Sequence, residues 1–262
     1  MILTLCAILL TTFSFGQQFY GAKSTGYGNL AAITFDTDAI FNNQAGLAMI
    51  EQAVFSSTVE KRYFWSDVNF AGAGFALPTS SGTFGIDLQA FGFSEFSQQK
   101  LGLSYGRIIH ESMSIGGQIN YHRIAIPEYG NDGAFSFEFG MQAKLADDLL
   151  IGVHMQNPFQ KGFTDEEKLQ TLFQLGMLYT VSEKVKIGVE FEKDIKKEMI
   201  IKSGLEYSPE KSILFRAGYS DNPANFHFGF GYVFNDHLQF DIGSKYDLTL
   251  GLTTSFGVSY LL

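Results

Sequence analysis

Large apolar side chains alternate with glycine, small polar or charged residues along most of this chain, ending at the C-terminus. In residues 226–234, every second position is aromatic: Phe226, Phe228, Phe230, Tyr232 and Phe234. Side chains of a β-strand point alternately to its two faces, so this pattern predicts strands with one apolar face. A soluble sandwich buries that face against a second sheet. Here almost every strand has large aromatics on one face and glycine or charge on the other, which favours a barrel facing lipid.

The alternation and the turn signals between its segments predict an all-β fold, a transmembrane antiparallel β-barrel of about fourteen strands. About fifteen residues per strand and turn suit membrane strands of about 9–11 residues. An even count places both ends of the barrel sequence on one side. The expected strands are 52–62, 67–78, 82–93, 98–108, 113–125, 133–145, 148–157, 169–180, 184–194, 197–208, 212–220, 225–234, 237–246 and 249–262.

The connections between these strands alternate in length. Every second connection is a short turn, such as Ser80-Ser81, Asp147-Asp148 and Asn235-Asp236, whereas the longer links, including residues 158–168, all fall between them. Outer-membrane barrels have short periplasmic turns and longer outer loops, and the sequence reproduces that asymmetry. The expected location is therefore the outer membrane.

Composition agrees with this interpretation. Charged residues are 17% of the sequence, against about 25% in typical soluble domains. Mean hydropathy is +0.05, as expected when each strand averages an apolar and a polar face. Beyond the N-terminus, no run of about 18 apolar residues could span a membrane as a helix. The net charge of −9 argues against a nucleic-acid partner.

The first fifty residues do not alternate. Residues 1–16 (MILTLCAILLTTFSFG) resemble a secretory signal peptide, although a basic leading region is absent. The single cysteine, Cys6, lies within it, so no disulfide or thiolate chemistry is expected in the remainder. Residues 17–50 are expected to form a hatch that plugs the barrel of residues 51–262. Asp36 or Asp38 could cap a short helix over residues 39–44, with Gly46 ending it.

Residues 17–50 contain two motifs that follow one another closely. Their positions are Gly21, Ala22, Ser24, Gly26, Gly28, Asp36, Ala39, Ile40, Phe41, Asn43, Ala45, Gly46 and Leu47. At these positions the segment resembles the N-terminal signature of FadL-like barrels, particularly the PorV-type outer-membrane proteins of Bacteroidota. Gln44 stands where that signature usually has proline. The resemblance implies a fourteen-stranded barrel with a hatch, and either passage of hydrophobic substrates or a partner role in type IX protein secretion.

Positions on the inward face carry charges of both signs. One interpretation is an ion-selective channel, but a selective pore usually shows one dominant sign at its constriction. Interleaved signs favour a mutually neutralising lattice that fills the lumen. Its expected members are Asp87, Glu138, Lys144, Lys186, Glu190, Glu198, Lys202, Glu206, Arg216, Asp241 and Lys245, with Lys100 and Glu192 beside them.

Glycine also recurs on the inward face. These glycines either clear room for the hatch or a ligand, or relieve the curvature of a small barrel. They are Gly85, Gly102, Gly116, Gly140, Gly152, Gly188, Gly204, Gly229, Gly243 and Gly251.

The sequence carries no strong catalytic or metal-binding motif. His122, His154 and His227 are expected to face inward, but on strands that are not neighbours, so no metal site is expected. A Ser–His pair is a weaker alternative because no serine stands out among many. No phosphate loop or dinucleotide fingerprint occurs, and no cofactor is expected.

Three functional classes fit a barrel of this kind. A general porin needs an unplugged lumen, and a hydrophobic-compound transporter usually has long apolar outer loops for capture. Short loops and a filled interior instead favour a non-enzymatic accessory barrel that docks against a larger outer-membrane assembly, with type IX secretion as the implied system. The alternative is a FadL-like transporter of hydrophobic small molecules across the outer membrane. The expected partners are outer-membrane lipid and another outer-membrane protein, and no nucleic acid.

Overall fold

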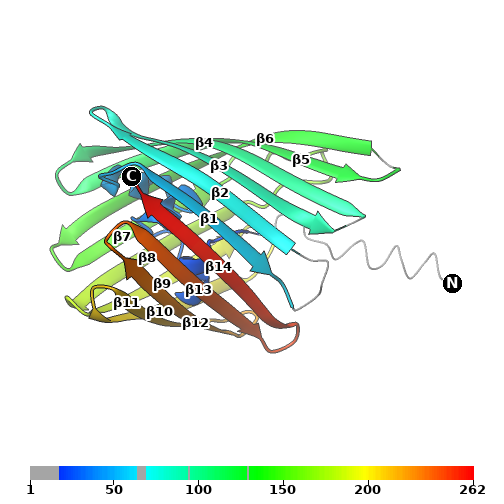
Figure 1. Cartoon of the computed structure of the whole chain (residues 1–262). Coiled ribbons are helices and arrows are strands. Elements are labelled where there is room, and N and C mark those ends of the chain that lie inside the picture. Colours follow the sequence, from blue (N-terminus) through cyan, green and yellow to red (C-terminus); the bar gives the residue numbers. More distant parts are fainter. Residues whose placement is uncertain (1–17, 64–68, 94, 129) are drawn as a thin grey trace.

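The computed structural model describes residues 18–63, 69–93, 95–128 and 130–262, and its strands form one closed antiparallel barrel (Figure 1). Consecutive strands are neighbours, and β14 closes on β1. The predicted fourteen-stranded fold is confirmed, whereas the expected signal peptide over 1–16 lies outside the described residues. The strands are β1 (Val54–Lys61), β2 (Asn69–Thr79), β3 (Gly82–Phe93), β4 (Phe96–His110), β5 (Met113–Ile126), β6 (Gly130–Ala146), β7 (Leu149–Gln156), β8 (Leu172–Ser182), β9 (Val185–Asp194), β10 (Met199–Glu210), β11 (Ile213–Ser220), β12 (Asn225–Phe234), β13 (Leu238–Asp247) and β14 (Gly251–Leu261).

The outer wall of the barrel is apolar. Outward side chains remain widely exposed, including Leu103 at 58% and Phe228 at 58%. Aromatics on neighbouring strands contact each other across this wall, for example Phe215 with Phe230 at 5.7 Å between ring centroids. Such an apolar exterior over polar and small inward positions is that of a membrane-spanning barrel in contact with lipid. Among the described helices, none has the length and apolarity to cross a membrane.

The two ends of the barrel differ. The end carrying the tight turns after β2, β4, β6, β8, β10 and β12 is called the short-turn end, and the opposite end, with residues 157–171, the long-loop end. Pairing shifts register at four places, each within a few residues of a tight turn: Ile108/His110, Lys144/Ala146, Thr180/Ser182 and Tyr207/Glu210. Because the shifts are confined to that rim, the printed strand ladders leave the middle of the wall continuously paired.

Residues 18–53 precede the barrel, and the helical segments among them contact its inner wall. They include helix α2 (Ala22–Gly26) and the 3-10 helices η1 (Thr37–Ile40) and η2 (Gln44–Met49). This segment is called the hatch below. Two apolar clusters fill the space between hatch and wall: Phe19, Ile40, Phe41, Leu47 and Phe70 contribute to one, and Leu30, Ile33, Leu150 and Leu178 form the other.

The hatch contains two short helices where the sequence predicted one over residues 39–44. Asp36 caps η1, accepting a hydrogen bond from the Asp38 amide at 3.1 Å. Asn43 then adopts an extended conformation and caps η2, so the prediction of a single helix over residues 39–44 was wrong. Gly46 does not end a helix but lies within η2, where a Cβ would come 2.1 Å from the Thr34 carbonyl oxygen. Close packing within the hatch explains this glycine.

A ring of inward glycines accommodates the hatch. A Cβ built on any of them would lie 2.9 Å or less from a hatch atom. This glycine ring consists of Gly72, Gly74, Gly106, Gly116, Gly140, Gly152, Gly176, Gly188, Gly204, Gly218, Gly229, Gly243 and Gly257. Three expected glycines differ: Gly85 lies first against Ser104, Gly102 faces Asp87, and Gly251 sits at a turn with φ +95°. Clearing room for the hatch is thus the role of the other seven expected glycines.

Candidate functional site

The residues of the hatch motif hold the hatch together and fit it to the wall. All of them are buried except Asp36, which is half-buried and forms an ion pair with Lys23. Asp38, which the motif does not include, accepts hydrogen bonds from the amide and hydroxyl of Ser24, each at 2.9 Å. Asp38 therefore joins α2 to η1. Position 26 requires glycine because a Cβ there would lie 2.6 Å from Gly229 Cα.

The two hatch carboxyl groups differ electrostatically. Burial opposes the charge of Asp36, but the neighbouring Lys23 ammonium outweighs it and holds the pKa of Asp36 below its usual value. Burial and the neighbouring Asp36 carboxylate together raise the pKa of Asp38 to about 7. Asp36 is thus the charged partner of Lys23, while Asp38 acts mainly as a hydrogen-bond acceptor within the hatch.

Two consecutive side chains fasten the hatch to the wall. The Asn43 amide donates to the Ala32 carbonyl at 2.6 Å and to the Val153 carbonyl of β7 at 3.1 Å. Gln44 Nε2 lies 3.0 Å from Glu138 Oε2 and 3.2 Å from Gln118 Oε1, and also donates to the Asn42 carbonyl at 2.8 Å. Gln44, which stands where the resembling signature usually has proline, therefore connects the hatch to the charged residues of the lumen.

Glu138 on β6 is the centre of one ionic group. Its two oxygens lie 3.0 Å from Lys100 Nζ and 3.2 Å from His154 Nε2. The other ring nitrogen of His154 is 2.9 Å from Gln174, which donates to Glu192 at 2.7 Å. A chain of buried contacts thus runs from β4 to β9.

A second group surrounds Lys202 on β10. Its ammonium lies 3.1 Å from Glu190 and 2.6 Å from Glu192. The same ammonium donates to the Asn29 carbonyl at 3.0 Å, and Glu190 accepts from the Ala32 amide at 2.7 Å. These contacts tie the hatch to the wall on the β9–β10 side. Buried charges need such partners, since an unpaired one is costly.

Arg216 on β11 forms a third group with Glu206 at 2.8 Å and Asp241 at 2.6 Å. Lys186 is half-buried and lies 3.5 Å from Glu206. In these three groups each cation therefore contacts one or two carboxylates. Asp87 is held by the amides of Gln89 and Gln118 at 2.9 and 2.8 Å.

Three expected members of the lattice lie apart from these groups. Glu198 is exposed in the connection between β9 and β10, so its placement in the lumen was wrong. Lys144 has an inward register on β6, but its position near the short-turn end leaves it exposed. Lys245 faces inward, half-buried, without an ion pair within 4.0 Å among the described residues. The prediction for Glu198 failed because β10 begins one residue later than Glu198, at Met199.

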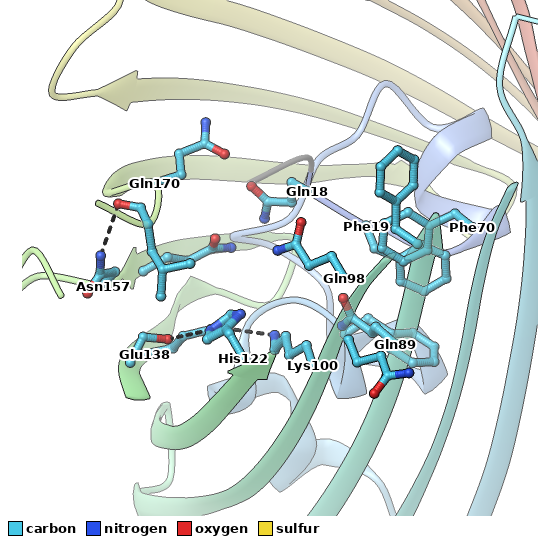
Figure 2. A pocket seen from close by; sticks show the side chains of 16 residues that line it. Gln18, Phe19, Phe70, Gln89, Gln98, Lys100, His122, Glu138, Asn157 and Gln170 are labelled. Atoms are coloured by element: carbon cyan, nitrogen blue, oxygen red, sulfur yellow. Dashed lines mark hydrogen bonds and ion pairs between the residues drawn. The ribbon is translucent and has the colours of Figure 1, made fainter. Parts of the chain in front are cut away.

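A cavity of about 80 Å³ lies inside the barrel on the long-loop side of the hatch. In Figure 2, Phe19 and Phe70 lie together on one side, while Lys100, His122 and Glu138 lie close to one another on another side. Phe41 and Phe91 also line it, as do Gln18 and Gln89. The cavity therefore combines an aromatic wall with a polar wall, which is typical of small-molecule sites.

Phe41 was expected in the hatch motif and Glu138 in the charged lattice, but Phe19, Phe70 and Phe91, which also line this cavity, were not among the predicted sites. Phe70 on β2 and Phe91 on β3 occupy inward register positions, between glycines and polar residues. An aromatic on the polar face is the signal that could have identified them. Phe19 and Phe41 belong to the hatch, and strand periodicity contains no information about where the hatch lies.

A second cavity of about 30 Å³ lies toward the short-turn end. It is lined by hatch residues, including Lys23, Tyr27 and Phe35, and by Lys186 and Glu206 of the wall. The two cavities share no lining residue. The hatch therefore separates a chamber at the long-loop end from one at the short-turn end.

No family model and no curated protein matches the sequence. The fold is similar to the Pseudomonas putida toluene transporter TodX, with a TM-score of 0.75 at 10% identity over 95% of this chain and 98% of that chain. The Ralstonia pickettii toluene transporter TbuX gives 0.76 at 10% identity over 95% and 99%. A Pseudomonas aeruginosa FadL homologue gives 0.69 at 10% identity over 94% and 99%. These likenesses show a shared fold over nearly the whole chain. In fold alone they agree with the FadL-like part of the expected resemblance, and nothing among them supports the PorV-type or Bacteroidota part.

Proposed function

We propose that this protein is a non-enzymatic outer-membrane channel that admits small hydrophobic or aromatic molecules and is closed by its hatch. The observation that carries the proposal is the cavity walled by Phe19, Phe41, Phe70 and Phe91, within a barrel whose fold is shared with two toluene transporters. Stacked and edge-on aromatic rings favour a planar apolar guest.

The asymmetry of the barrel gives this channel a direction. Short turns face the periplasm in outer-membrane barrels, so the aromatic cavity lies on the outer side of the hatch. A molecule entering from outside reaches that cavity first. Because the second cavity shares no lining residue with it, passage onward requires the hatch to move.

The accessory role expected from the sequence has less support. It depended on short loops and a filled lumen, and both are compatible with a gated channel for small molecules. The fold comparisons favour the transporter alternative, and no contact in the described residues favours a protein partner or type IX secretion. Lipid is the partner that the apolar wall requires.

Uptake by whole cells tests the proposal. A Gram-negative host expressing the chain should accumulate radiolabelled toluene faster than a host carrying the empty vector. A charged control of similar size, such as radiolabelled glutamate, should enter both hosts at equal rates. Equal toluene uptake with and without the barrel, at confirmed surface expression, would argue against a transport function.

A further inference from the structure

The cavity on the long-loop side has two chemically different walls. On one, the Phe19 ring stacks on Phe70 with centroids 4.7 Å apart, and Phe41 meets Phe19 edge-on at 5.1 Å. On the other lie His122, Lys100 and Glu138 (Figure 2). A pure hydrocarbon would satisfy the aromatic wall alone.

Polar atoms at this cavity are buried without partners. Nδ1 of His122 is buried and has no hydrogen-bond partner among the described residues, although Nε2 of the same ring lies 2.8 Å from the Ser136 hydroxyl. Both polar side-chain atoms of Gln18 are in the same condition within the described part of the chain. A buried polar atom without a partner is costly. A ligand carrying a hydrogen-bonding group would remove that cost.

The charges at this wall already neutralise each other. Lys100 and Glu138 lie 3.0 Å apart, and Glu138 also accepts from Asn120 at 2.8 Å. An anionic ligand would have to compete with Glu138 for Lys100. His122 is the cross-strand neighbour of Lys100, so a positive charge on the imidazole is disfavoured. The free hydrogen-bonding capacity therefore belongs to neutral groups.

The size of the cavity limits the ligand further. Its volume is about 80 Å³, whereas an apolar cavity known to hold benzene measures about 150 Å³. The largest ligand that fits is therefore a single ring that projects partly toward the long-loop end. A long acyl chain is excluded from the enclosed part.

We infer that this cavity binds a small, uncharged single-ring aromatic that carries a hydroxyl or similar hydrogen-bonding group, the phenol class. The ring lies against Phe19 and Phe70, and the hydroxyl bonds to Nδ1 of His122 and to Gln18. This inference rests on the proposed function, because it takes the cavity as part of the transport route and names what the cavity prefers.

Three probes of one shape separate the possibilities: toluene, p-cresol and p-toluate. Equilibrium dialysis of each radiolabelled probe against lipid nanodiscs with the full-length protein, corrected by empty nanodiscs, measures specific binding. We expect p-cresol to bind most tightly. His122→Phe keeps a ring but removes Nδ1, so p-cresol should bind at least about fivefold more weakly, the equivalent of one hydrogen bond. Toluene binding to that variant should not weaken. Gln18→Leu should act in the same direction.

His110→Phe is the matched control, because His110 is exposed at the short-turn end. Its p-cresol affinity should equal that of the unaltered protein. Tighter binding of toluene or p-toluate than of p-cresol would overturn the inference and, if toluene uptake is retained, leave the proposed function standing. Unchanged p-cresol affinity in both His122→Phe and Gln18→Leu would also overturn it. Absence of binding by all three probes, together with absence of toluene uptake, would overturn both.

Discussion

Gln44 is the residue at which the hatch and the ionic groups of the lumen meet. It is fully buried, and its amide nitrogen reaches both Gln118 and Glu138. Glu138 in turn contacts Lys100 and His154, so one side chain links the hatch, directly or through Glu138, to the four strands β4, β5, β6 and β7. Proline, the residue usual in the resembling motif, has no side-chain donor and could not make this connection.

Replacing Gln44 by leucine should loosen the hatch. Glu138 loses a buried donor, so we expect the free energy of unfolding to fall by about 1–3 kcal/mol. Urea unfolding in lipid vesicles measures the change, and hydrogen exchange should accelerate at the η2 amides. Gln52→Leu is the matched control because Gln52 is exposed just before β1. A Gln44→Leu protein as stable and as protected as that control would show that the contact contributes nothing.

Among the strands, the glycine ring determines how closely the hatch approaches the wall. Gly116 and Gly117 are adjacent on β5 but point to opposite faces. A Cβ on Gly116 would lie 2.3 Å from the Gln44 carbonyl carbon and 2.5 Å from the Ala45 nitrogen. A Cβ on Gly117 would meet its nearest atom, the Glu138 carbonyl oxygen, at an ordinary 3.5 Å.

The two alanine substitutions should therefore have opposite outcomes. Gly116→Ala forces backbone of the hatch away from β5, and overpacking of this kind costs about 1–3 kcal/mol. Planar-bilayer recording should show larger or more frequent openings, and protease should cut the hatch sooner. Gly117→Ala should behave like the unaltered protein in both assays. Equal behaviour of the two variants would mean that the hatch does not depend on this close approach.

At the scale of elements, periodicity predicted the wall well because every strand faces the same two environments. β3 and β12 begin and end at the expected residues, 82–93 and 225–234. The hatch was harder to predict because it has no repeating pattern. Its helix over 39–44 is interrupted at Asn43, whose side chain serves both as a cap and as a donor to β7. The alternation placed most inward charges correctly, but it failed at Glu198, which precedes the first residue of β10, Met199.

The candidate site shows the limit of the same reasoning. Parity places Phe70 and Phe91 inward, and they line the cavity with Phe19 and Phe41 of the hatch. Only the three-dimensional position of the hatch decides which stretch of the inner wall remains uncovered. That position depends on contacts between residues far apart in sequence, such as Ala32 with Glu190.

For the molecule as a whole, the hatch must move if a solute is to cross. A disulfide between hatch and wall would prevent that movement. A Cβ on Gly176 of β8 would lie 3.3 Å from the Ala32 Cβ, close to the 3.5–4.5 Å usual between bridged cysteines. The single natural cysteine, Cys6, lies outside the hatch and barrel.

The double variant Ala32→Cys with Gly176→Cys should therefore give a redox-controlled channel. Oxidation of this variant should lower toluene uptake to the level of the empty vector, and treatment with a reductant should restore the uptake. The two single-cysteine variants serve as controls and should not respond to reductant. Undiminished uptake by fully oxidised double variant would show that solutes pass without displacement of this part of the hatch.

The seat of α2 has a consequence for biosynthesis. Ala22 packs against Gly243 and Gly257, and the Thr25 carbonyl is hydrogen-bonded to His227 at 2.8 Å. Helix α2 is synthesised early but packs against strands that are synthesised last. Contacts between residues so far apart in the sequence form slowly. A chain ending before β12 lacks the three strands, β12, β13 and β14, against which α2 mainly packs. The hatch can therefore complete its packing only after the last three strands have joined the barrel.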